Sequence, residues 1–349
     1  MSQIWWNQVT NAVRYVSEIT DSLLDEKSIL IKHTSSMPWK NDFEDCVRNT
    51  ISEQNSDKRF EDILPTDNPG DYLLNEFCKK EKRATFRPSK GYAKFLAESD
   101  DIVLHDRYLW VQIENLDSLE KWTNFVSEYI QERGKRTKAV FVLDVASDIN
   151  VSSKRGVKQY FLGDYIGEYD RIVFAVLAAS EINECSFIKS YLSELVANIC
   201  GNDIELCNQC ISQHVKFMCE PYALIKQICT DLSRSDGQPF AFSLSDEEVD
   251  HLIWQSQIKT IYPYIEEYRE EFVRKYSKDI DLQLPISASY GEVYNDPNDV
   301  ELGTLKYMAD NNLIRLSSAE YEKLKRFKNA RNKLSHLTYL TMEEIKAII

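Results

Sequence analysis

Two spacings of hydrophobic positions alternate along the first part of the chain. Residues 8–25 and 119–131 carry apolar side chains at helical spacing. Short runs that are almost continuously apolar lie between and after these segments. They occupy residues 28–32, 108–113, 139–144 and 171–177. Continuous apolar strands alternating with helices are typical of a mostly parallel sheet with helices on both faces. The pattern therefore predicts an N-terminal α/β domain.

The middle of the chain is divided by polar and helical segments. Residues 57–100 are polar and rich in loop-forming residues, and residues 182–232 return to helical spacing. The stretch 233–239 is small and polar and contains Gly237 and Pro239. Such a composition is typical of a linker. We therefore predict an α/β domain at residues 1–235 and a second domain at residues 240–349.

The second domain shows only helical spacing, without a strand pattern from residue 245 onward. Its apolar stripe begins at Val249 and continues for about thirty residues, and Pro263 is expected to kink that helix. A shorter helix is expected at 300–311. Three capping boxes mark helix starts, each pairing a hydroxyl residue with a glutamate three positions later: Ser245 with Glu248, Ser317 with Glu320, and Thr341 with Glu344. These signals predict an all-α helical bundle.

The composition and the apolar runs indicate the cellular compartment and whether the protein contacts a membrane. The 349 residues are 43% hydrophobic and 28% charged, which is ordinary for a globular protein. No apolar run approaches the length of a membrane span, and the N-terminus lacks the pattern of a secretion signal. We therefore expect a cytoplasmic protein with no membrane contact.

The charge of the chain is acidic overall and basic in one place. A net charge of −14 argues against a protein that coats nucleic acid non-specifically. One segment near the C-terminus nevertheless carries six basic residues and no acid: Lys323, Lys325, Arg326, Lys328, Arg331 and Lys333. A solvated helix face explains such a run about as well as RNA binding does.

Cysteine and glycine usage argues against a bound metal or nucleotide. Cys207 and Cys210, with His214 nearby, supply only part of a tetrahedral zinc site, so we expect free thiols. The segment 33–40, which follows the first expected strand, contains no glycine, and Gly134-Lys135 is followed by Arg136. A phosphate-binding loop of the usual kind is therefore not expected, and we predict no cofactor.

Acidic residues lie where nucleotide enzymes place their metal-binding acids. Glu114 and Asp117 follow one expected strand, and Asp144 ends another. The arrangement is loosely similar to an NTPase-type α/β domain that lacks its phosphate-binding machinery. Without a phosphate loop, solvated strand-end acids are the preferred interpretation.

A short motif near the C-terminus carries the clearest chemistry. Arg331-Asn332 is followed by three residues and then by His336, at the end of an expected helix. An arginine binds phosphate through charge-assisted hydrogen bonds, and a histidine exchanges protons near neutral pH. The bland alternative is an exposed helix end whose cations complement the helix dipole.

This motif resembles the signature of HEPN-superfamily ribonucleases, and the likeness covers roughly residues 245–349. The resemblance implies RNA cleavage without metal, with the ribose 2′-hydroxyl as nucleophile. It implies that His336 is the general acid or base, that Arg331 stabilises charge on the phosphate, and that Asn332 positions His336. Lys325, Lys328 and Lys333 are the candidate contacts to RNA.

Helix geometry sets a condition on this site. Arg331 and His336 are five positions apart, about 140° around a helix axis. Either the helix ends near Ser335, or a homodimer through the C-terminal helices completes the site, as is usual in that superfamily.

Two functional hypotheses follow from these observations. The first is a metal-independent endoribonuclease effector of a prokaryotic phage-defence or toxin system, whose N-terminal domain senses a trigger or binds a protein partner. The second is a non-catalytic HEPN-like interaction module of a larger assembly. Whether Arg331 and His336 face an open cleft or a buried core helps to distinguish them.

Overall fold

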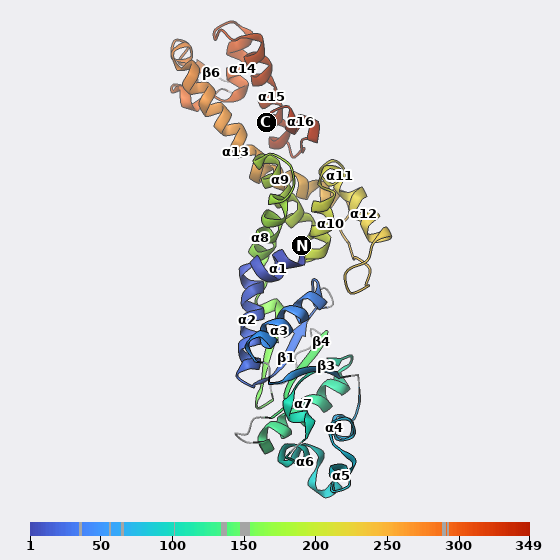
Figure 1. The fold of residues 1–349 in the computed structure, drawn as a ribbon. Helices are drawn as coiled ribbons and strands as arrows, with labels where there is room; N and C mark the ends of the chain where they lie inside the picture. The colour runs from blue at the N-terminus through green and yellow to red at the C-terminus, as the bar shows by residue number, and fades with distance from the viewer. Residues whose placement is uncertain are drawn as a thin grey trace. The chain divides into compact units, whose positions relative to one another are not determined.

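Two compact units make up the computed structural model. The structure describes residues 1–34, 37–55, 57–63, 66–100, 102–133, 138–146, 154–287, 291 and 293–349. Contacts divide the chain into Met1–Phe174 and Ala175–Ile349, and each unit is described by itself (Figure 1). Gly134 and Lys135 lie outside the described residues.

A five-stranded, entirely parallel sheet forms the centre of the first unit. Its order is β2-β3-β4-β1-β5. The strands are β1 (Ser28–His33), β2 (Arg59–Ile63), β3 (Arg107–Ile113), β4 (Val140–Ala146) and β5 (Val157–Phe161). The expected parallel sheet is confirmed, and three of its strands match the apolar runs at 28–32, 108–113 and 139–144.

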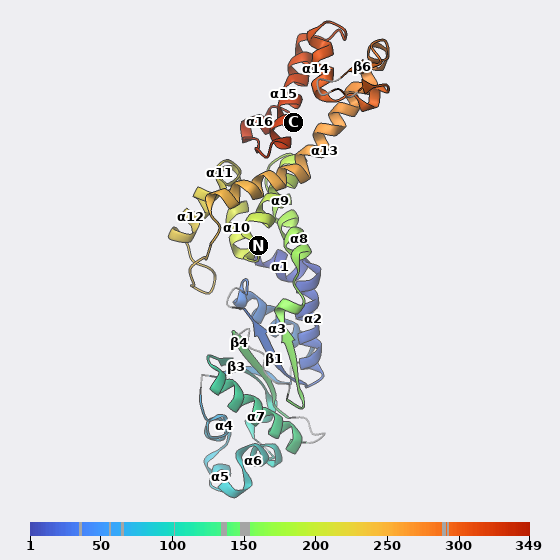
Figure 2. The ribbon, with the colours of Figure 1, turned by 180° about the vertical axis from the view of Figure 1, so that it is seen from behind.

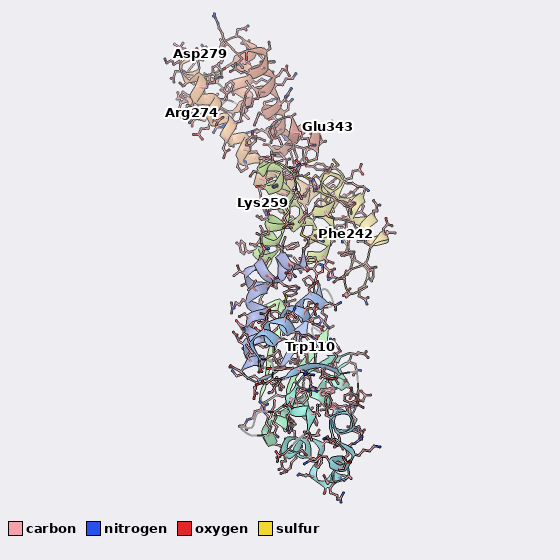
Figure 3. The ribbon with its side chains drawn as sticks, viewed as in Figure 1. Trp110, Phe242, Lys259, Arg274, Asp279 and Glu343 are labelled. Atoms are coloured by element: carbon pink, nitrogen blue, oxygen red, sulfur yellow. The ribbon has the colours of Figure 1, made fainter. Side chains whose placement is uncertain are left out.

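Helices cover both faces of the sheet, because successive strand side chains point to opposite sides. On β3, Leu109 and Val111 pack with Trp122 of α7, whereas Trp110 contacts Phe43 of α3. Figure 3 labels Trp110 within this sheet. The helices of this unit are α1 (Ser2–Gln8), α2 (Thr10–Leu24), α3 (Lys40–Gln54), α4 (Pro69–Phe77), α5 (Lys80–Arg83), α6 (Tyr92–Glu98) and α7 (Leu116–Arg133).

Two expectations about this sheet were wrong, and a further strand was missed. Residues 171–177 belong to α8 (Glu168–Ser180) and form no strand. Phe174, Ala175 and Ala178 are buried at helical spacing, and alanine favours a helix. The expected loop region 57–100 contains β2 and three helices, and β5 was missed. Polar edge strands such as β2 do not show the continuous apolar run that identified the others.

Helices dominate the second unit. They are α9 (Ser186–Cys200), α10 (Ile204–Ser212), α11 (His214–Cys219), α12 (Pro221–Asp231), α13 (Asp246–Asp281), α14 (Leu302–Asp310), α15 (Ser318–Ser335) and α16 (Met342–Lys346). A two-stranded ribbon, β6 (Ile286–Ser287) with β7 (Val293–Tyr294), interrupts them, so the expectation of helices alone after residue 245 was wrong in this detail.

The long helix α13 joins the other helices of the second unit. It packs against α9 near its start and against α15 farther along. Lys259 of α13 and Glu194 of α9 form an ion pair of 2.6 Å, and Figure 3 labels Lys259. Backbone angles stay helical at Pro263, whereas Tyr276 has a non-helical pair of angles. Figure 2 shows α13 bending along its length.

Local capping signals are confirmed at the starts of three helices. Reciprocal side-chain and backbone hydrogen bonds form all three predicted boxes, at α13, α15 and α16. Each box satisfies backbone N–H groups that the helix itself leaves without partners. The box of Ser317 and Glu320 fixes the residue at which α15 begins. The motif lies at the other end of the same helix.

The stretch 233–239 is held by buried ion pairs. The Arg234 guanidinium is buried and lies 2.6 Å from Asp203 and 3.6 Å from Glu205. These ion pairs lie within the second unit, since the division by contacts falls between Phe174 and Ala175 and not at the predicted boundary near residue 235. Among the helices in the described part of the chain, none combines the length and apolar character needed to cross a membrane.

Candidate active site

The helix that carries the motif has one apolar and one basic face. Leu324, Phe327, Ala330 and Leu334 recur at helical spacing on α15 and are buried. The Phe327 ring stacks on Tyr268 of α13 with ring centroids 3.8 Å apart. This packing leaves the basic residues of α15 on its outer side.

The helix ends at the residue given by one of the two alternatives from the sequence. Ser335 is its last residue, and His336 is the first with non-helical backbone angles. The Thr338 amide donates to the Lys333 carbonyl at 3.0 Å, and the Leu337 amide donates to the Leu334 carbonyl at 3.4 Å. This pair of bonds is the Schellman arrangement that closes many helices.

Leu337 has an unusual conformation beside the candidate histidine. Its φ is +59°, in the left-handed region that glycine usually occupies at this position. A leucine there is strained by about 1–2 kcal/mol, and its side chain is 72% exposed. The hydrogen bonds on both sides of Leu337 hold this backbone in place. Packing, and not the backbone preference of leucine, therefore sets the direction in which the chain continues after His336.

The motif side chains lie at the surface and not in the core. His336 is exposed, and Asn332 and Arg331 are half-buried. The Arg331 Nη2 lies 3.0 Å from the Glu301 Oε2. Within the described residues, neither the His336 ring nor the Asn332 amide has a hydrogen-bond partner. The imidazole is therefore accessible to a substrate, whereas the guanidinium already has an acidic partner.

Two side chains of α13 fix the segment around His336. The Trp254 Nε1 donates to the Leu334 carbonyl at 2.8 Å. The Gln257 side chain is fully buried and binds the backbone of Leu340 at both groups: its Oε1 accepts from the amide at 2.6 Å, and its Nε2 donates to the carbonyl at 2.9 Å. Sequence reasoning missed both residues, because an isolated Trp or Gln in a helix carries no signal of a distant partner.

The three candidate RNA-binding lysines differ in their surroundings. Lys325 lies 3.8 Å from Glu322, and Lys333 pairs with Glu344 of α16. Lys328 is half-buried and forms no ion pair with a residue that the structure describes. On α15, Lys325, Lys328 and Asn332 fall within about 60° of one another, so these three share a face.

The carboxyl ends of β1 and β4 hold a buried polar cluster. Asp144 accepts hydrogen bonds from the His33 Nε2 at 3.0 Å and the Trp110 Nε1 at 3.1 Å, and the Lys40 Nζ lies 3.0 Å away. Burial acts to raise the pKa of Asp144, but His33 and Lys40 hold that pKa below its usual value. Asp144 is thus a buried, ion-paired group, whereas the preferred interpretation was a solvated acid. That interpretation was wrong for this residue.

The other two strand-end acids and the cysteines show no comparable site. Glu114 is exposed, and Asp117 pairs with Lys121 at 2.6 Å. The Cys200 and Cys210 Sγ atoms lie 3.6 Å apart in the core, and His214 lies 3.8 Å from Glu184. Over the residues that the structure describes, no three His, Cys, Asp or Glu side chains come together as a metal would require.

Comparison with known proteins does not indicate a function for this chain. No protein-family model matches the chain, and no curated protein shows significant sequence similarity to it. The structure shows a unit with a parallel five-stranded sheet, followed by a largely helical region. Any function must therefore be argued from the site itself.

Proposed function

We propose that this chain is a metal-independent endoribonuclease effector of the HEPN type, with a site built around His336. The observation that carries the proposal is the accessible imidazole at the end of α15, within the Arg331-Asn332-x-x-x-His336 motif. Neutral imidazole accepts a proton and imidazolium donates one near neutral pH. An imidazole buried in the core could not reach a substrate, so its exposure supports this role.

The proposed reaction is an internal transfer at phosphorus. His336 removes the proton of a ribose 2′-hydroxyl, and the 2′-oxygen attacks the adjacent phosphorus. The bond from phosphorus to the 5′-oxygen breaks, and the imidazolium form of His336 gives its proton to that oxygen. The products are a 2′,3′-cyclic phosphate and a 5′-hydroxyl. The Arg331 of a second copy would complete each site, as is usual in the superfamily that the motif resembles.

Arg331 has to exchange its partner to take part. It would leave Glu301 and bind the non-bridging phosphate oxygens, where negative charge grows in the transition state. The Glu301 side chain is 52% exposed, and an exposed ion pair is worth about 0–1 kcal/mol. A phosphate that makes two charge-assisted bonds to the guanidinium outweighs that loss.

We assign the first unit to recognition within a prokaryotic phage-defence or toxin system. The support is the cluster around Asp144, in which Lys40 at the start of α3 is held by a buried carboxylate. A lysine held this way is less available for a phosphate group. This favours binding of a protein partner or trigger over nucleotide hydrolysis.

The test is cleavage of a fluorescently labelled single-stranded RNA by the full chain in excess chelator. His336→Ala is expected to lower the rate about 10²–10⁴-fold, and Arg331→Ala by a comparable factor. Matched controls are His214→Ala and Arg274→Ala, which remove the same residue types from outside the motif and outside the basic segment of α15. If the double variant His336→Ala, Arg331→Ala cleaves as fast as wild type, the proposal is wrong.

A second candidate is a non-catalytic HEPN-like interaction module. It is favoured by the ion pairs that occupy the basic residues, Arg331 with Glu301 and Lys333 with Glu344. In that case Arg331→Ala or Glu301→Ala would weaken assembly or stability by similar amounts. RNA cleavage by wild type, lost in His336→Ala, would exclude this candidate.

A further inference from the structure

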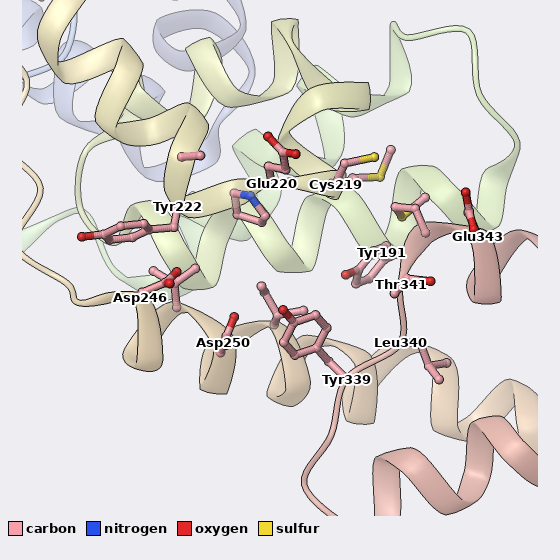
Figure 4. A pocket seen from close by; sticks show the side chains of 16 residues that line it. Tyr191, Cys219, Glu220, Tyr222, Asp246, Asp250, Tyr339, Leu340, Thr341 and Glu343 are labelled. Atoms are coloured by element: carbon pink, nitrogen blue, oxygen red, sulfur yellow. The ribbon is translucent and has the colours of Figure 1, made fainter.

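A cavity of about 560 Å³ opens in the second unit. Some of its lining residues follow the motif closely in the sequence, but no motif residue lines it. Figure 4 shows it between the starts of α12 and α13 and the segment that follows His336. Its floor is apolar and buried, with Met218, Val249, Ile253, Leu340 and Met342. A concave apolar floor is the general feature of a binding site.

Carboxylates surround the opening of this cavity. Glu220, Asp246, Asp250 and Glu343 line it and are exposed, and no basic residue is among the lining residues. Within the part of the chain that the structure describes, none of these four forms an ion pair. Lys226 lies beside one wall of the cavity, with its Nζ 5.3 Å from the centre of the Tyr222 ring.

Helix starts explain only part of this charge. Asp246 is the first residue of α13, Glu220 is the N-cap residue of α12, and Glu343 lies in the first turn of α16, where acids complement the helix dipole. Each of these three helix ends contributes about half a positive charge. With Lys226 included, an excess of between about one and two negative charges remains. Asp250 lies beyond the first turn of α13, so complementing the dipole does not account for it.

Aromatic and hydroxyl groups complete the cavity wall. Tyr222 and Tyr339 are half-buried, and rings of this kind attract cations through their faces. Burial and the nearby charge of Asp250 raise the pKa of Tyr339 above its ordinary value, so this ring stays neutral. The wall therefore combines neutral rings with carboxylates, as sites for organic cations do.

Tyr191 adds an observation that does not depend on the acids. It is only 1% exposed and lines the cavity, and Figure 4 shows its hydroxyl directed inward. The hydroxyl oxygen accepts a bond of 3.1 Å from the Gln257 Nε2. Its own proton has no acceptor among the described residues. A buried hydroxyl with an unused donor costs free energy, so a ligand with an acceptor group fits this position.

We propose that this cavity binds an arginine side chain of a partner protein, with a carbonyl of the partner's backbone accepting from Tyr191. An arginine has an apolar stem for the floor and a planar cation for the rings and carboxylates. A free polyamine carries the charge but lacks the acceptor. The inference concerns binding alone and does not depend on ribonuclease activity.

The methionines of the chain allow a direct test. Met218 and Met342 line the cavity, whereas Met37 and Met308 are buried elsewhere. We expect a dissociation constant of about 1 mM for an arginine peptide. The peptide acetyl-Gly-Gly-Arg-Gly-Gly-amide is added to full-length protein with ¹³C-labelled methionine methyl groups, up to several times that concentration. The Met218 and Met342 signals are expected to shift, and those of Met37 and Met308 to stay. The same peptide with neutral citrulline in place of arginine is expected to shift neither pair.

Variants show whether the charges matter. Asp250→Asn is expected to weaken binding of the arginine peptide about two- to fivefold, as for the loss of one exposed charge contact. Glu247→Gln removes an exposed acid from the same helix but outside the cavity, and it is expected to leave binding unchanged. Equal shifts with the citrulline peptide, or unchanged binding by Asp250→Asn, would overturn the proposal. Shifts produced by spermidine at lower concentration than by the peptide would overturn the assignment to a partner protein.

Discussion

The indole Nε1 of Trp254 donates a hydrogen bond to the Leu334 carbonyl, two residues before His336, at 2.8 Å. Carbonyls in the last turn of a helix lack partners within that helix, and here a residue 80 positions earlier supplies one. The long helix α13 therefore holds the end of α15 in place. The position of the candidate histidine depends on this contact between helices as well as on its own sequence.

The buried amide of Gln257 should be the strongest element of that support. Gln257→Met keeps a similar volume but leaves the Leu340 amide and carbonyl without partners. We expect a loss of about 2–4 kcal/mol in stability, seen as a lower urea midpoint and faster hydrogen exchange at Leu340. Gln255→Met, on the same helix with its side chain bonded to His251, is the control. Equal effects of both substitutions would contradict this role.

If the site is shared between two chains, inactive variants should rescue each other. His336→Ala supplies an intact arginine, and Arg331→Ala supplies an intact histidine. With random pairing, about half of the dimers are mixed, and one of the two sites in each is complete. Mixing equal amounts should restore about a quarter of the wild-type cleavage rate. If the mixture stays as inactive as its components, the site is not shared between two chains.

The lysines of α15 should affect binding more than chemistry. Lys325→Ala and Lys328→Ala are each expected to weaken RNA binding modestly, with the cleavage rate at saturation unchanged. Each should reduce the slope of binding against salt concentration by about 0.7, the value for one contact to single-stranded phosphate. Lys278→Ala, at the end of α13, is the control. An unchanged salt slope for both α15 variants would remove these lysines from the RNA surface.

Asp144 should stabilise the first unit in a pH-dependent way. Asp144→Asn leaves Lys40 beside a neutral group in a buried site, which is expected to cost about 3–5 kcal/mol. Because the folded pKa is lowered, the stabilisation is complete above the unfolded pKa of about 3.9 and is lost as pH falls through the folded pKa. The difference in urea midpoint between wild type and variant should therefore shrink below about pH 4.

Asp117→Asn serves as the matched control for that experiment. Asp117 is 72% exposed and pairs with Lys121 on the same helix, so its loss should change stability by less than about 1 kcal/mol. A pH-independent effect of Asp144→Asn would show that its contribution is packing and not charge.

Local signals in the sequence determined much of this fold. The three capping boxes involve residues three positions apart, and the structure forms each of them. The apolar runs at 28–32, 108–113 and 139–144 identified strands that are buried on both faces. Such features depend on neighbouring residues, whose spacing is visible in the sequence. The end of α15 near Ser335 was one of the two alternatives set by helix geometry, but it depends on packing as well, because Leu337 has a left-handed backbone that leucine does not favour.

Only the tertiary structure decided which distant residues meet. A short apolar run is compatible with a strand or a helix, and burial at helical spacing made 171–177 part of α8. Glu301 meets Arg331 across 30 positions, and Gln257 meets Leu340 across 83. Asp144 meets His33 across 111. A polar side chain paired with a distant partner has no periodic pattern, because its contact depends on how the apolar faces pack and not on neighbouring residues.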